Sequence, residues 1–461
     1  MGKTIRKGDI LEVKVEKMVP EGLGLGRSED GIIVFVNGAY PGEKAKVEVY
    51  KKKKSYLEAK TLEIIGEKHP KRKEPECPHF GICGGCRFLD IEYQTRLDFK
   101  EELIKDALER IGEIDLSTVD FETIVPSPRK FRHRNKMEFA FGTGDKGNVI
   151  LGLRKPGDFA SVIKADDCLL LPELSNDFMR GLLEEIAQTG LTAYDAHTKS
   201  GDLRYLTLRF NTKDEFLAYI TINDRDSKMI FEPIFQNLSA KFSTMKGAGV
   251  FINEGSGGTA TGDMETLYGI DYLEQDAGDV TFRVSPVSFF QTNIYATPLL
   301  VKQVDRFTNP GKTLWDLFSG IGTLSLPLAH KFELIYGIEI VEEAVEDAMA
   351  NAKRNGIKDV MYIANTLRKG LHQLREISNP DVLVFDPPRS GIGKKALRAI
   401  MREAPPEIVY VSCNPVSLSR DINYISDMYR LEKVRAVDMF PHTYHVETVT
   451  RLVLKETESD T

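Results

Sequence analysis

Hydrophobic and polar residues alternate through the first part of the chain. The alternation runs through four segments separated by glycine-containing turns: DILEVKVEKM (9–18), GIIVFV (31–36), EKAKVEVYK (43–51) and YLEAKTLEII (56–65). A period of two residues is typical of strands with one buried face. Several short strands with such turns predict a small β-barrel of the oligonucleotide-binding type over residues 1–62.

The middle of the chain mixes helical and strand patterns. A polar linker with three cysteines covers residues 63–92, and EYQTRLDFKEELIKDALERIG then shows a helical period that ends at Gly112. MEFAFG, VILGLR, YLTLRF and FLAYITI have the composition of strands, with a helix expected around NDFMRGLLEEIAQTG. We therefore expect a helix and a central β-rich α+β domain over residues 93–270, which would also bind nucleic acid.

The last part of the chain alternates strands with helices. TLWDLF, LIYGIEI, VLVFD and EIVYVS have the pattern of buried strands, and they alternate with helical stretches such as VEEAVEDAMANAKRNG. This order is the signature of a parallel, doubly wound sheet. The predicted fold class is therefore α/β, with a Rossmann-like domain over residues 271–461.

Composition agrees with a globular protein of several domains. The chain has 461 residues, of which 41% are hydrophobic and 28% charged, which is ordinary for such proteins. Its apolar runs are only strand-sized, and its first residues lack the apolar stretch of a signal peptide. We therefore expect a cytoplasmic monomer without a membrane partner.

Basic residues are clustered in spite of the negative total charge. A net charge of −7 argues mildly against nucleic-acid binding, but binding requires local rather than total positive charge. Lys and Arg gather at Lys51–Lys54 and in RKFRHRNK (129–136). Arg132, Arg134 and Lys136 are therefore candidate RNA contacts, although a basic run can equally be a solvated surface.

A glycine turn follows the first strand of the α/β part. SGIGTLSLPLA predicts a turn around Gly320 and Gly322 that opens a helix, and the next strand ends in Glu339. A carboxylate at that place can bond the ribose hydroxyls of an adenosine. Because Ser325 replaces the third glycine of a dinucleotide motif, the pattern favours S-adenosylmethionine over a nicotinamide cofactor. Asn365, at the next strand end, could meet the adenine edge or cap a helix.

Two later strand ends carry candidate catalytic side chains. Asp386 begins DPPRSGIG, and Cys413 lies in SCNP one strand further on. Ligands of open α/β sheets bind at such carboxyl ends, and the polar loop after Cys413 favours a reactive thiol over a buried one. Glu447 in FPHTYHVETV is the candidate base, with a surface carboxylate as the alternative reading and His442 and His445 as the next candidates.

The remaining four cysteines have the spacing of a metal site. Cys77, Cys83 and Cys86 form C-x5-C-x2-C, and Cys168 is a distant fourth thiol. Four thiolates suit either zinc or an iron–sulfur cluster, and spacing alone does not separate the two. A radical S-adenosylmethionine enzyme is disfavoured, because it would use three cysteines at C-x3-C-x2-C.

Taken together, these motifs resemble the RNA uracil-C5 methyltransferase family. SFFQTN, DLFSGIGTLSLPLA, DPPRSG, SCNP and HVETV occur in the order of that family. The first sixty residues resemble the TRAM domain, an RNA-binding barrel, and CPHFGICGGC resembles the cysteine motif of the branch that carries an iron–sulfur cluster.

The resemblance implies a role for each motif. It implies that a set of side chains binds S-adenosylmethionine, namely Gln291, Phe318, Glu339, Asn365 and Asp386. It makes Cys413 the nucleophile and Glu447 the proton acceptor, and it favours a [4Fe–4S] cluster on the four cysteines. Such a thiolate would add to C6 of uracil and so activate C5 for methylation.

Four hypotheses for the function follow. A uridine of 23S ribosomal RNA is the leading one, because the simpler transfer-RNA enzymes of the family lack the barrel and the cysteine motif. The T loop of transfer RNA is the near alternative. An RNA-binding protein without catalysis conflicts with the intact Cys413 and Glu447, and a small-molecule methyltransferase would have no use for an RNA-binding barrel.

Overall fold

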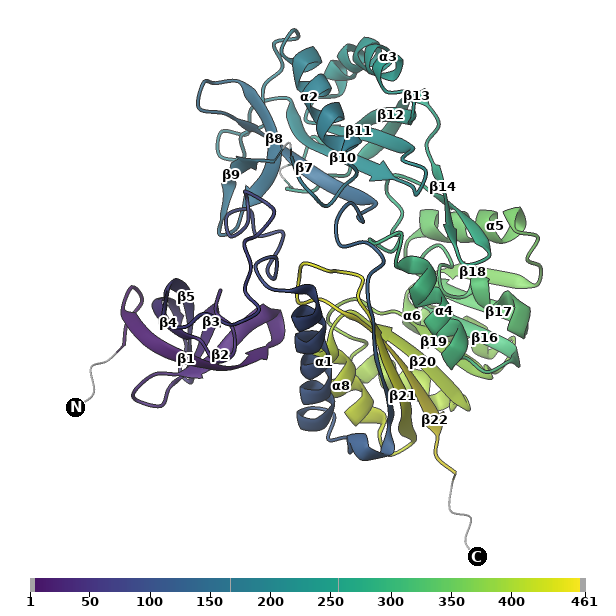
Figure 1. The fold of residues 1–461 in the computed structure, drawn as a ribbon. Helices are drawn as coiled ribbons and strands as arrows, with labels where there is room; N and C mark the ends of the chain where they lie inside the picture. Colours follow the sequence, from purple (N-terminus) through teal and green to yellow (C-terminus); the bar gives the residue numbers. More distant parts are fainter. Residues whose placement is uncertain (1–4, 166, 256, 457–461) are drawn as a thin grey trace, which may run out of the picture.

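The first part of the molecule is a closed five-stranded barrel with strand order β1-β2-β3-β5-β4 (Figure 1). The computed structural model describes residues 5–165, 167–255 and 257–456. The barrel strands are β1 (Ile10–Val19), β2 (Leu23–Arg27), β3 (Ile33–Asn37), β4 (Lys44–Lys52) and β5 (Tyr56–Ile65), with the short 3-10 turn η1 (Pro20–Gly22) after β1. Alternate residues such as Val13, Val15 and Val47 are buried inside. The barrel predicted from the period of two is confirmed.

The central part is a seven-stranded sheet with strand order β13-β12-β11-β10-β7-β8-β9. Its strands are β7 (Lys136–Thr143), β8 (Val149–Lys155), β9 (Asp158–Lys164), β10 (Leu203–Phe210), β11 (Phe216–Ile222), β12 (Met245–Ile252) and β13 (Asp263–Gly269). Helices α2 (Leu174–Ile186) and α3 (Phe231–Lys241) pack on this sheet and share its main core. The 3-10 helix η3 (Arg225–Ile230) directly precedes α3. The expected strands and the expected helix are present.

The C-terminal part is an eight-stranded sheet with strand order β18-β17-β16-β19-β20-β22-β21-β6. Its strands are β6 (Asp120–Val125), β16 (Gly311–Leu317), β17 (Phe332–Glu339), β18 (Val360–Ala364), β19 (Val382–Phe385), β20 (Glu407–Ser412), β21 (Tyr429–Val437) and β22 (Glu447–Leu454). The first five in this order are parallel, and β22 runs antiparallel between β20 and β21. The chain goes to β17 on one side of β16 and returns to β19 on the other, which makes this edge a ligand-binding switch point.

Helices cover both faces of this sheet. One face carries α1 (Tyr93–Arg110), α6 (Leu367–Arg375), α7 (Lys394–Ile400) and α8 (Pro415–Ile425), whose buried residues share one core cluster. The other face carries α4 (Thr297–Phe307) and α5 (Glu342–Arg354). The hairpin β14 (Leu273–Ala277) and β15 (Val280–Val284) leads into this part, and η2 (Leu116–Thr118) and η5 (Met401–Glu403) are short 3-10 turns. The predicted α/β fold is therefore confirmed. No helix within the described ranges is long and apolar enough to cross a lipid bilayer.

Helix α1 and strand β6 lie in the C-terminal part in space, although the sequence suggested that they open the central domain. Helix α1 packs against α8, and β6 pairs in parallel with β21 at the edge of the eight-stranded sheet. The helical period revealed that α1 has a buried face but could not reveal what covers that face. The chain thus passes through the C-terminal part before and after it builds the central sheet.

The glycine turn differs from its prediction. We expected it to open a helix, but residues 318–325 form turns, and only the 3-10 helix η4 (Leu326–Lys331) follows. Phe318, Gly320 and Gly322 have φ values of 67°, 52° and 80°, which lie outside the right-handed helical region. Pro327 then lacks the backbone N–H that a continuing helix would need.

A buried ion pair joins α1 to the segment before β22. The Lys100 Nζ lies 2.5 Å from the Asp438 Oδ1, and neither side chain is exposed to solvent. The Tyr93 hydroxyl donates to the other oxygen of Asp438 at 2.7 Å. Burial lowers the pKa of Lys100, and the Asp438 carboxylate opposes that shift. The Lys100 ammonium therefore depends on Asp438 to remain charged in its buried position.

The barrel is attached to the same helix. The Lys17 Nζ donates to the Asp106 Oδ1 of α1 at 2.6 Å. Tyr40 of the barrel stacks on Phe99 of α1, with ring centroids 5.9 Å apart and planes 21° apart. Phe88 from the cysteine-rich linker completes this apolar cluster. Helix α1 thus fixes the barrel relative to the eight-stranded sheet.

We expect Asp438→Asn to lower the free energy of unfolding by about 3–5 kcal/mol, because it leaves the Lys100 ammonium buried without a counter-charge. Removing both charges in Lys100→Met with Asp438→Asn should cost less. Chemical denaturation followed by circular dichroism measures both values. Lys302→Met on the exposed side of α4 is the control and should change stability by less than about 0.5 kcal/mol. A single Asp438 variant as stable as this control would contradict the prediction.

Candidate active site

The predicted site residues gather at the carboxyl edge of the eight-stranded sheet. Glu339 ends β17, while Asp386 and Cys413 directly follow β19 and β20. These strands are neighbours or next neighbours of β16 in the sheet. Glu447 arrives at the same edge because it begins the antiparallel strand β22, which pairs with β20. Parallel strands and one reversed strand thus bring residues from distant parts of the chain to one place.

The donor side of the site is built around the Glu339 carboxylate. Its oxygens accept hydrogen bonds from the backbone N–H groups of Gly320 at 3.0 Å, Ile340 at 2.7 Å and Val341 at 3.0 Å. Glu339 and Gly320 also line an open cavity of about 460 Å³. The backbone bonds fix the carboxylate at the cavity wall, where it can accept from the hydroxyls of a bound ribose.

The other predicted donor-binding residues surround the same edge. Phe318, half-buried, begins the glycine turn and adopts a positive φ of 67°. Gly322 lies deeper in that turn, where an added Cβ would come within 2.7 Å of the Tyr362 hydroxyl. The side-chain oxygen of Asn365 accepts from the N–H of Thr366 at 3.0 Å, and its backbone N–H donates to the carbonyl of Glu339 at 2.8 Å. Asn365 therefore contacts both the start of α6 and the strand that ends in Glu339.

Gln291 and Asp386 form a bridge across the middle of the site. The Gln291 Nε2 donates to the Asp386 Oδ2 at 3.0 Å. The Gln291 carbonyl accepts from Asn135 at 3.2 Å, which ties this loop to the entry of the central sheet. Burial raises the pKa of Asp386 to about 7, and the bond from Gln291 opposes the shift. The central domain thus helps to position a carboxyl group of the catalytic edge.

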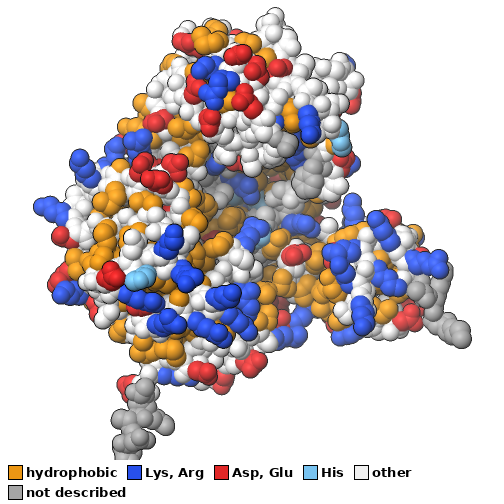
Figure 2. Space-filling model, turned by 180° about the vertical axis from the view of Figure 1, so that it is seen from behind, with side chains coloured by type: hydrophobic (Ala, Val, Ile, Leu, Met, Phe, Trp, Pro, Cys, Tyr) orange, Lys and Arg blue, Asp and Glu red, His pale blue; other side chains and the backbone are white. Residues whose placement is uncertain are grey.

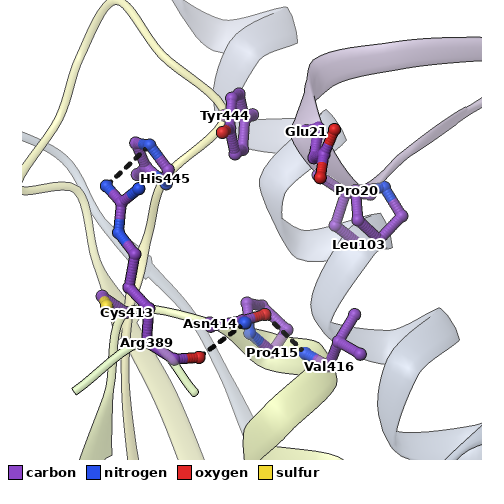
Figure 3. Close-up of a pocket in the computed structure, with 10 residues that line it drawn as sticks. All are labelled: Pro20, Glu21, Leu103, Arg389, Cys413, Asn414, Pro415, Val416, Tyr444 and His445. Atoms are coloured by element: carbon purple, nitrogen blue, oxygen red, sulfur yellow. Dashed lines mark hydrogen bonds between the residues drawn. The ribbon is translucent and has the colours of Figure 1, made fainter.

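Cys413 lines a second cavity of about 290 Å³ (Figure 3). The residues that line it are Pro20, Glu21, Leu103, Arg389, Cys413, Asn414, Pro415, Val416, Tyr444 and His445. The barrel turn and α1 form one wall, opposite the loops that carry Cys413 and Arg389 (Figure 3). The Asn414 side chain caps α8 through Val416 at 3.1 Å and also donates to the Arg389 carbonyl at 2.9 Å. Cys413 is thus followed by a turn that these hydrogen bonds hold beside the cavity.

Electrostatics around Cys413 keep its thiol protonated in the free protein. Burial raises the pKa of Cys413 to about 12, with further contributions from the Glu447 and Asp386 carboxylates. Arg389 acts in the opposite direction and lowers the pKa of the thiol. The guanidinium of Arg389 is held by the His445 Nε2 at 2.9 Å (Figure 3). The site therefore contains more acidic groups than cations before any ligand binds.

Glu447 is a buried carboxyl group with an unpaired oxygen. Only 4% of the residue is exposed, and its buried Oε2 has no hydrogen-bond partner among the described residues. Burial raises the pKa of Glu447 well above its usual value, Asp386 adds to the shift, and Arg389 opposes it. The reading of Glu447 as a surface carboxylate is therefore wrong. A carboxyl group with a raised pKa is suited to accept a proton near neutral pH.

The two neighbouring histidines are less suited to that role. His442 is buried, its Nδ1 lies 2.8 Å from an Arg96 nitrogen, and burial lowers its pKa to about 2. His445 lies beside Arg389, and burial lowers its pKa to about 4. Both imidazole rings are therefore neutral, and each is hydrogen-bonded to an arginine, His442 to Arg96 and His445 to Arg389.

The four remaining cysteines face one small cavity. Cys77, Cys83, Cys86 and Cys168 line it together with apolar residues that include Leu89 and Leu153. Burial raises the pKa of Cys86 to about 12, and Cys168 adds to the shift. Within the described ranges, however, no three His, Cys, Asp or Glu side chains converge closely enough to hold a metal ion. The thiols suit a cluster by type and common location, but their geometry does not form a ligand sphere.

The predicted RNA contacts lie near this cysteine cavity and already have protein partners. The Arg132 guanidinium donates to the carbonyls of Cys168 and Leu171. Burial lowers the pKa of Arg134, while Cys86 and Cys168 raise it. Lys136 lies 3.1 Å from Glu138. Arg132 and Arg134 thus support the loop that carries Cys168, and an RNA contact by these three residues stays a prediction.

Some site residues were missed in the sequence. Arg389 stands in the DPPRSG motif, and its position three residues after Asp386 was a usable signal. Pro20 and Glu21 of the barrel and Tyr444 gave no signal, because only tertiary packing brings them to the cavity of Cys413. The barrel therefore contributes to the wall of the site in addition to any binding by its outer surface.

Comparisons with known proteins agree with this geometry. The profile of the tRNA (uracil-5-)-methyltransferase family matches residues 263–455, and that of the TRAM domain matches residues 6–62. An RNA methyltransferase of Caldanaerobacter subterraneus subsp. tengcongensis is 38% identical over 452 residues, which cover 96% of this chain and 98% of the relative. The chain belongs to the RNA uracil-C5 methyltransferase family.

Further relatives support the membership in this methyltransferase family. An RNA methyltransferase of Chlorobaculum tepidum is 34% identical, with 96% of each chain covered. The solved tRNA (uracil-54, C5)-methyltransferase of Pyrococcus abyssi, in complex with S-adenosyl-L-homocysteine, has a TM-score of 0.74 and 26% identity, and the match covers 96% of this chain and all of that one. This protein is thus an enzyme that methylates C5 of uracil in RNA with S-adenosylmethionine.

The shifted pKa of Cys413 predicts how the thiol should react. Because S-adenosylmethionine carries a positive sulfonium, its binding should lower the pKa of the thiol and speed alkylation by iodoacetamide at pH 8. S-adenosyl-L-homocysteine has nearly the same shape without the charge and should have a smaller effect. Asp386→Asn removes a negative charge and should also speed alkylation in the free enzyme. Mass spectrometry of Cys413 across pH measures each rate, and identical profiles with both ligands would contradict the prediction.

Proposed function

We propose that this methyltransferase works through a covalent bond between Cys413 and C6 of the target uridine, with Glu447 as the base. The supporting observation is the buried Glu447 Oε2, which has no hydrogen-bond partner within the described part of the chain and lies at the same sheet edge as Cys413. Strands β20 and β22 are hydrogen-bonded neighbours, so the two side chains start from adjacent backbone positions. The target base would have to leave its stack to reach the cavity that Cys413 lines.

In the proposed first step, the Cys413 thiolate forms the S–C6 bond. The electron pair of the C5–C6 double bond moves towards O4, which turns C4–C5 into an enolate. C5 then bonds to the methyl carbon, the bond from methyl to sulfonium sulfur breaks, and S-adenosyl-L-homocysteine leaves with that electron pair. Arg389 would stabilise the thiolate before attack, because it lowers the pKa of Cys413.

In the last step, Glu447 takes the proton from C5. The electrons of that C–H bond restore the C5–C6 double bond and expel the Cys413 thiolate. The raised pKa of Glu447 makes its carboxylate a stronger base than an exposed one. Gln291 and Asp386 are joined by a hydrogen bond of 3.0 Å. They would hold the methyl donor and the target uracil in place between the two cavities.

Two classes of RNA are candidate substrates. The first is 23S ribosomal RNA, which we favoured because of the barrel and the cysteine motif. The second is the T loop of transfer RNA, supported by the Pyrococcus abyssi enzyme named for uracil-54 of tRNA. That enzyme aligns with 96% of this chain, so a barrel does not by itself select ribosomal RNA. A cytoplasmic monomer acting on either RNA remains our expectation.

We also propose that Cys77, Cys83, Cys86 and Cys168 hold a [4Fe–4S] cluster, with zinc as the alternative. All four line one cavity with largely apolar walls. The cluster would supply a cross-link between the linker after the barrel and the segment before α2. The Arg134 guanidinium nearby would offset the negative charge of the thiolates. No step of methyl transfer depends on it.

Replacing Glu447 by Gln should trap the covalent intermediate. The amide keeps the size of the side chain but cannot accept the C5 proton, so protein, RNA and methyl group should stay joined. A denaturing gel should show an RNA-shifted protein band that requires the methyl donor. Cys413→Ala with Glu447→Gln should give no band. Normal turnover by Glu447→Gln would exclude this residue as the base, and a band that survives loss of Cys413 would exclude the thiol as nucleophile.

Trapping also identifies the substrate. RNA that contains 5-fluorouracil should arrest the unchanged enzyme, because fluorine cannot leave as a cation. Sequencing the RNA from bands formed with total 5-fluorouracil RNA decides between 23S ribosomal RNA and transfer RNA. Enrichment of a transfer-RNA T loop would replace the ribosomal hypothesis.

Purification without oxygen should yield a brown protein with absorbance near roughly 400 nm, as thiolate-bound [4Fe–4S] clusters show. Metal analysis should find about four iron atoms and four sulfides per chain. Cys86→Ser should remove the colour and the iron, while Cys413→Ser should keep both. Stoichiometric zinc without iron in the unchanged protein would show that the site is a zinc site.

A further inference from the structure

A basic groove lies outside the two cavities of the active site. It has a volume of about 620 Å³ and runs between α6 and the α7–η5 segment. Five of its ten lining residues are Lys or Arg, namely Arg368, Arg375, Lys395, Arg398 and Arg402. None of the described residues that line it is acidic. Figure 2 shows Lys and Arg side chains gathered on the face of the α/β domain that it displays. We call this feature the α6–α7 groove.

Most of the positive charge of this groove is not neutralised by the protein. Arg375 is paired with Glu403. Among the described residues, Arg368, Lys395 and Arg402 have no ion-pair partner, and Arg398 donates only to the Tyr424 hydroxyl. The whole chain nevertheless carries a net charge of −7. Positive charges held side by side on an acidic protein raise the local potential and attract a polyanion.

The apolar residues of the groove are less exposed than its cations. Leu367, Leu371, Ala396 and Ala399 are buried or half-buried, whereas four of the five cations are exposed. We call the apolar residues the floor and the cations of the two helices the walls, and this floor can receive flat or apolar groups. A single RNA strand fits this pattern, because its sugars and bases can contact the floor while its phosphates meet the cations. A free phosphate would use only the walls.

The groove is continuous with the active site along the chain. Helix α6 begins two residues after Asn365, at the edge that holds the donor. Helix α7 follows the loop that runs from Asp386 through Arg389, and Arg389 lines the cavity of Cys413. Both helices therefore start at the carboxyl edge of the sheet and carry their cations away from it.

We propose that the α6–α7 groove binds the phosphate backbone of a single-stranded segment of the substrate RNA that flanks the target uridine. The proposal rests on the activity as an RNA methyltransferase, and it is independent of the choice between ribosomal and transfer RNA. Arg368 on one wall and Lys395 on the other would each contact phosphate. Arg375, held by Glu403, would form the far end of the groove.

Charge reversal on both walls tests this binding surface. The double variant Arg368→Glu with Lys395→Glu should raise the Kd for RNA roughly tenfold at about 0.15 M KCl. The slope of log K against log [KCl] should become shallower by about 1.4, since each lost phosphate contact of a single strand contributes about 0.7. Fluorescence anisotropy with labelled transcripts of an unmodified tRNA and of a 23S rRNA domain measures both quantities. The KM for RNA should rise while kcat at saturating RNA stays unchanged.

A matched control carries the same change of net charge elsewhere. Lys302 on α4 and Lys312 at the start of β16 are both exposed, and they lie on the other face and at the opposite edge of the sheet. Lys302→Glu with Lys312→Glu should leave the salt slope within error of the unchanged enzyme. The neutral pair Arg368→Ala with Lys395→Ala should show about the same loss of slope as the reversal, which separates lost contacts from new repulsion.

The outcomes are distinct. If the groove variant binds both transcripts with the slope of the control, the groove does not hold RNA, and an acidic protein partner becomes the better occupant. If the groove variant loses kcat at saturating RNA, the residues act in catalysis and the proposal is wrong. Trapping by 5-fluorouracil RNA at saturation should persist in the groove variant, so a failure of the Cys413 mechanism would be recognised separately.

Discussion

The buried ion pair between Lys100 and Asp438 fixes the relation between the parts of this enzyme. Asp438 lies between β21 and the loop that leads to His445 and Glu447, and Lys100 lies in the middle of α1. Because the barrel rests on α1 through Lys17 and a stack of aromatic rings, one helix positions both the barrel and the loop that leads to Glu447. A buried pair adds little net stability, but the loss of one partner is costly, so the pair specifies a single arrangement.

The active site combines this fixed frame with an uneven charge distribution. Asp386, Glu447 and the Cys413 thiol are all shifted towards their protonated forms by burial. Arg389 is the cation that acts on both Cys413 and Glu447. A cationic methyl donor therefore complements the charge of this site. By linkage, whatever ionises the carboxyl groups also tightens the binding of that donor.

Local patterns in the sequence were sufficient for most of the fold. The barrel could be predicted because the period of two in β1 is visible in consecutive residues. The positions of Glu339, Asp386 and Cys413 could be predicted because β17, β19 and β20 end at or just before them. Long-range packing could not be read in this way. The sequence of α1 shows that one face is buried but not which element covers it. The positive φ at Phe318, which prevents the expected helix from starting there, is likewise absent from the sequence pattern.

The candidate site shows the same division. Cys413 was predictable because a polar loop follows its strand. The burial of Glu447 was not, since it depends on β22 inserting between β20 and β21. Arg132 and Arg134 stand in a basic run, yet Arg132 donates to the Cys168 carbonyl and Arg134 is buried near the Cys86 and Cys168 thiols. Such side chains satisfy buried partners that only the folded chain brings near.

The insertion of β22 has a consequence for the timing of activity. This strand carries Glu447 into the middle of the sheet, and the cavity beside it is walled by Pro20 and Glu21 from the barrel. A ribosome must therefore synthesise both of these distant segments before Cys413, Glu447 and the cavity wall can come together. Until then, a growing chain presents a barrel and a half-built sheet in which β22 does not yet pair with β20. The topology thus delays the assembly of this sheet edge until β22 has been made.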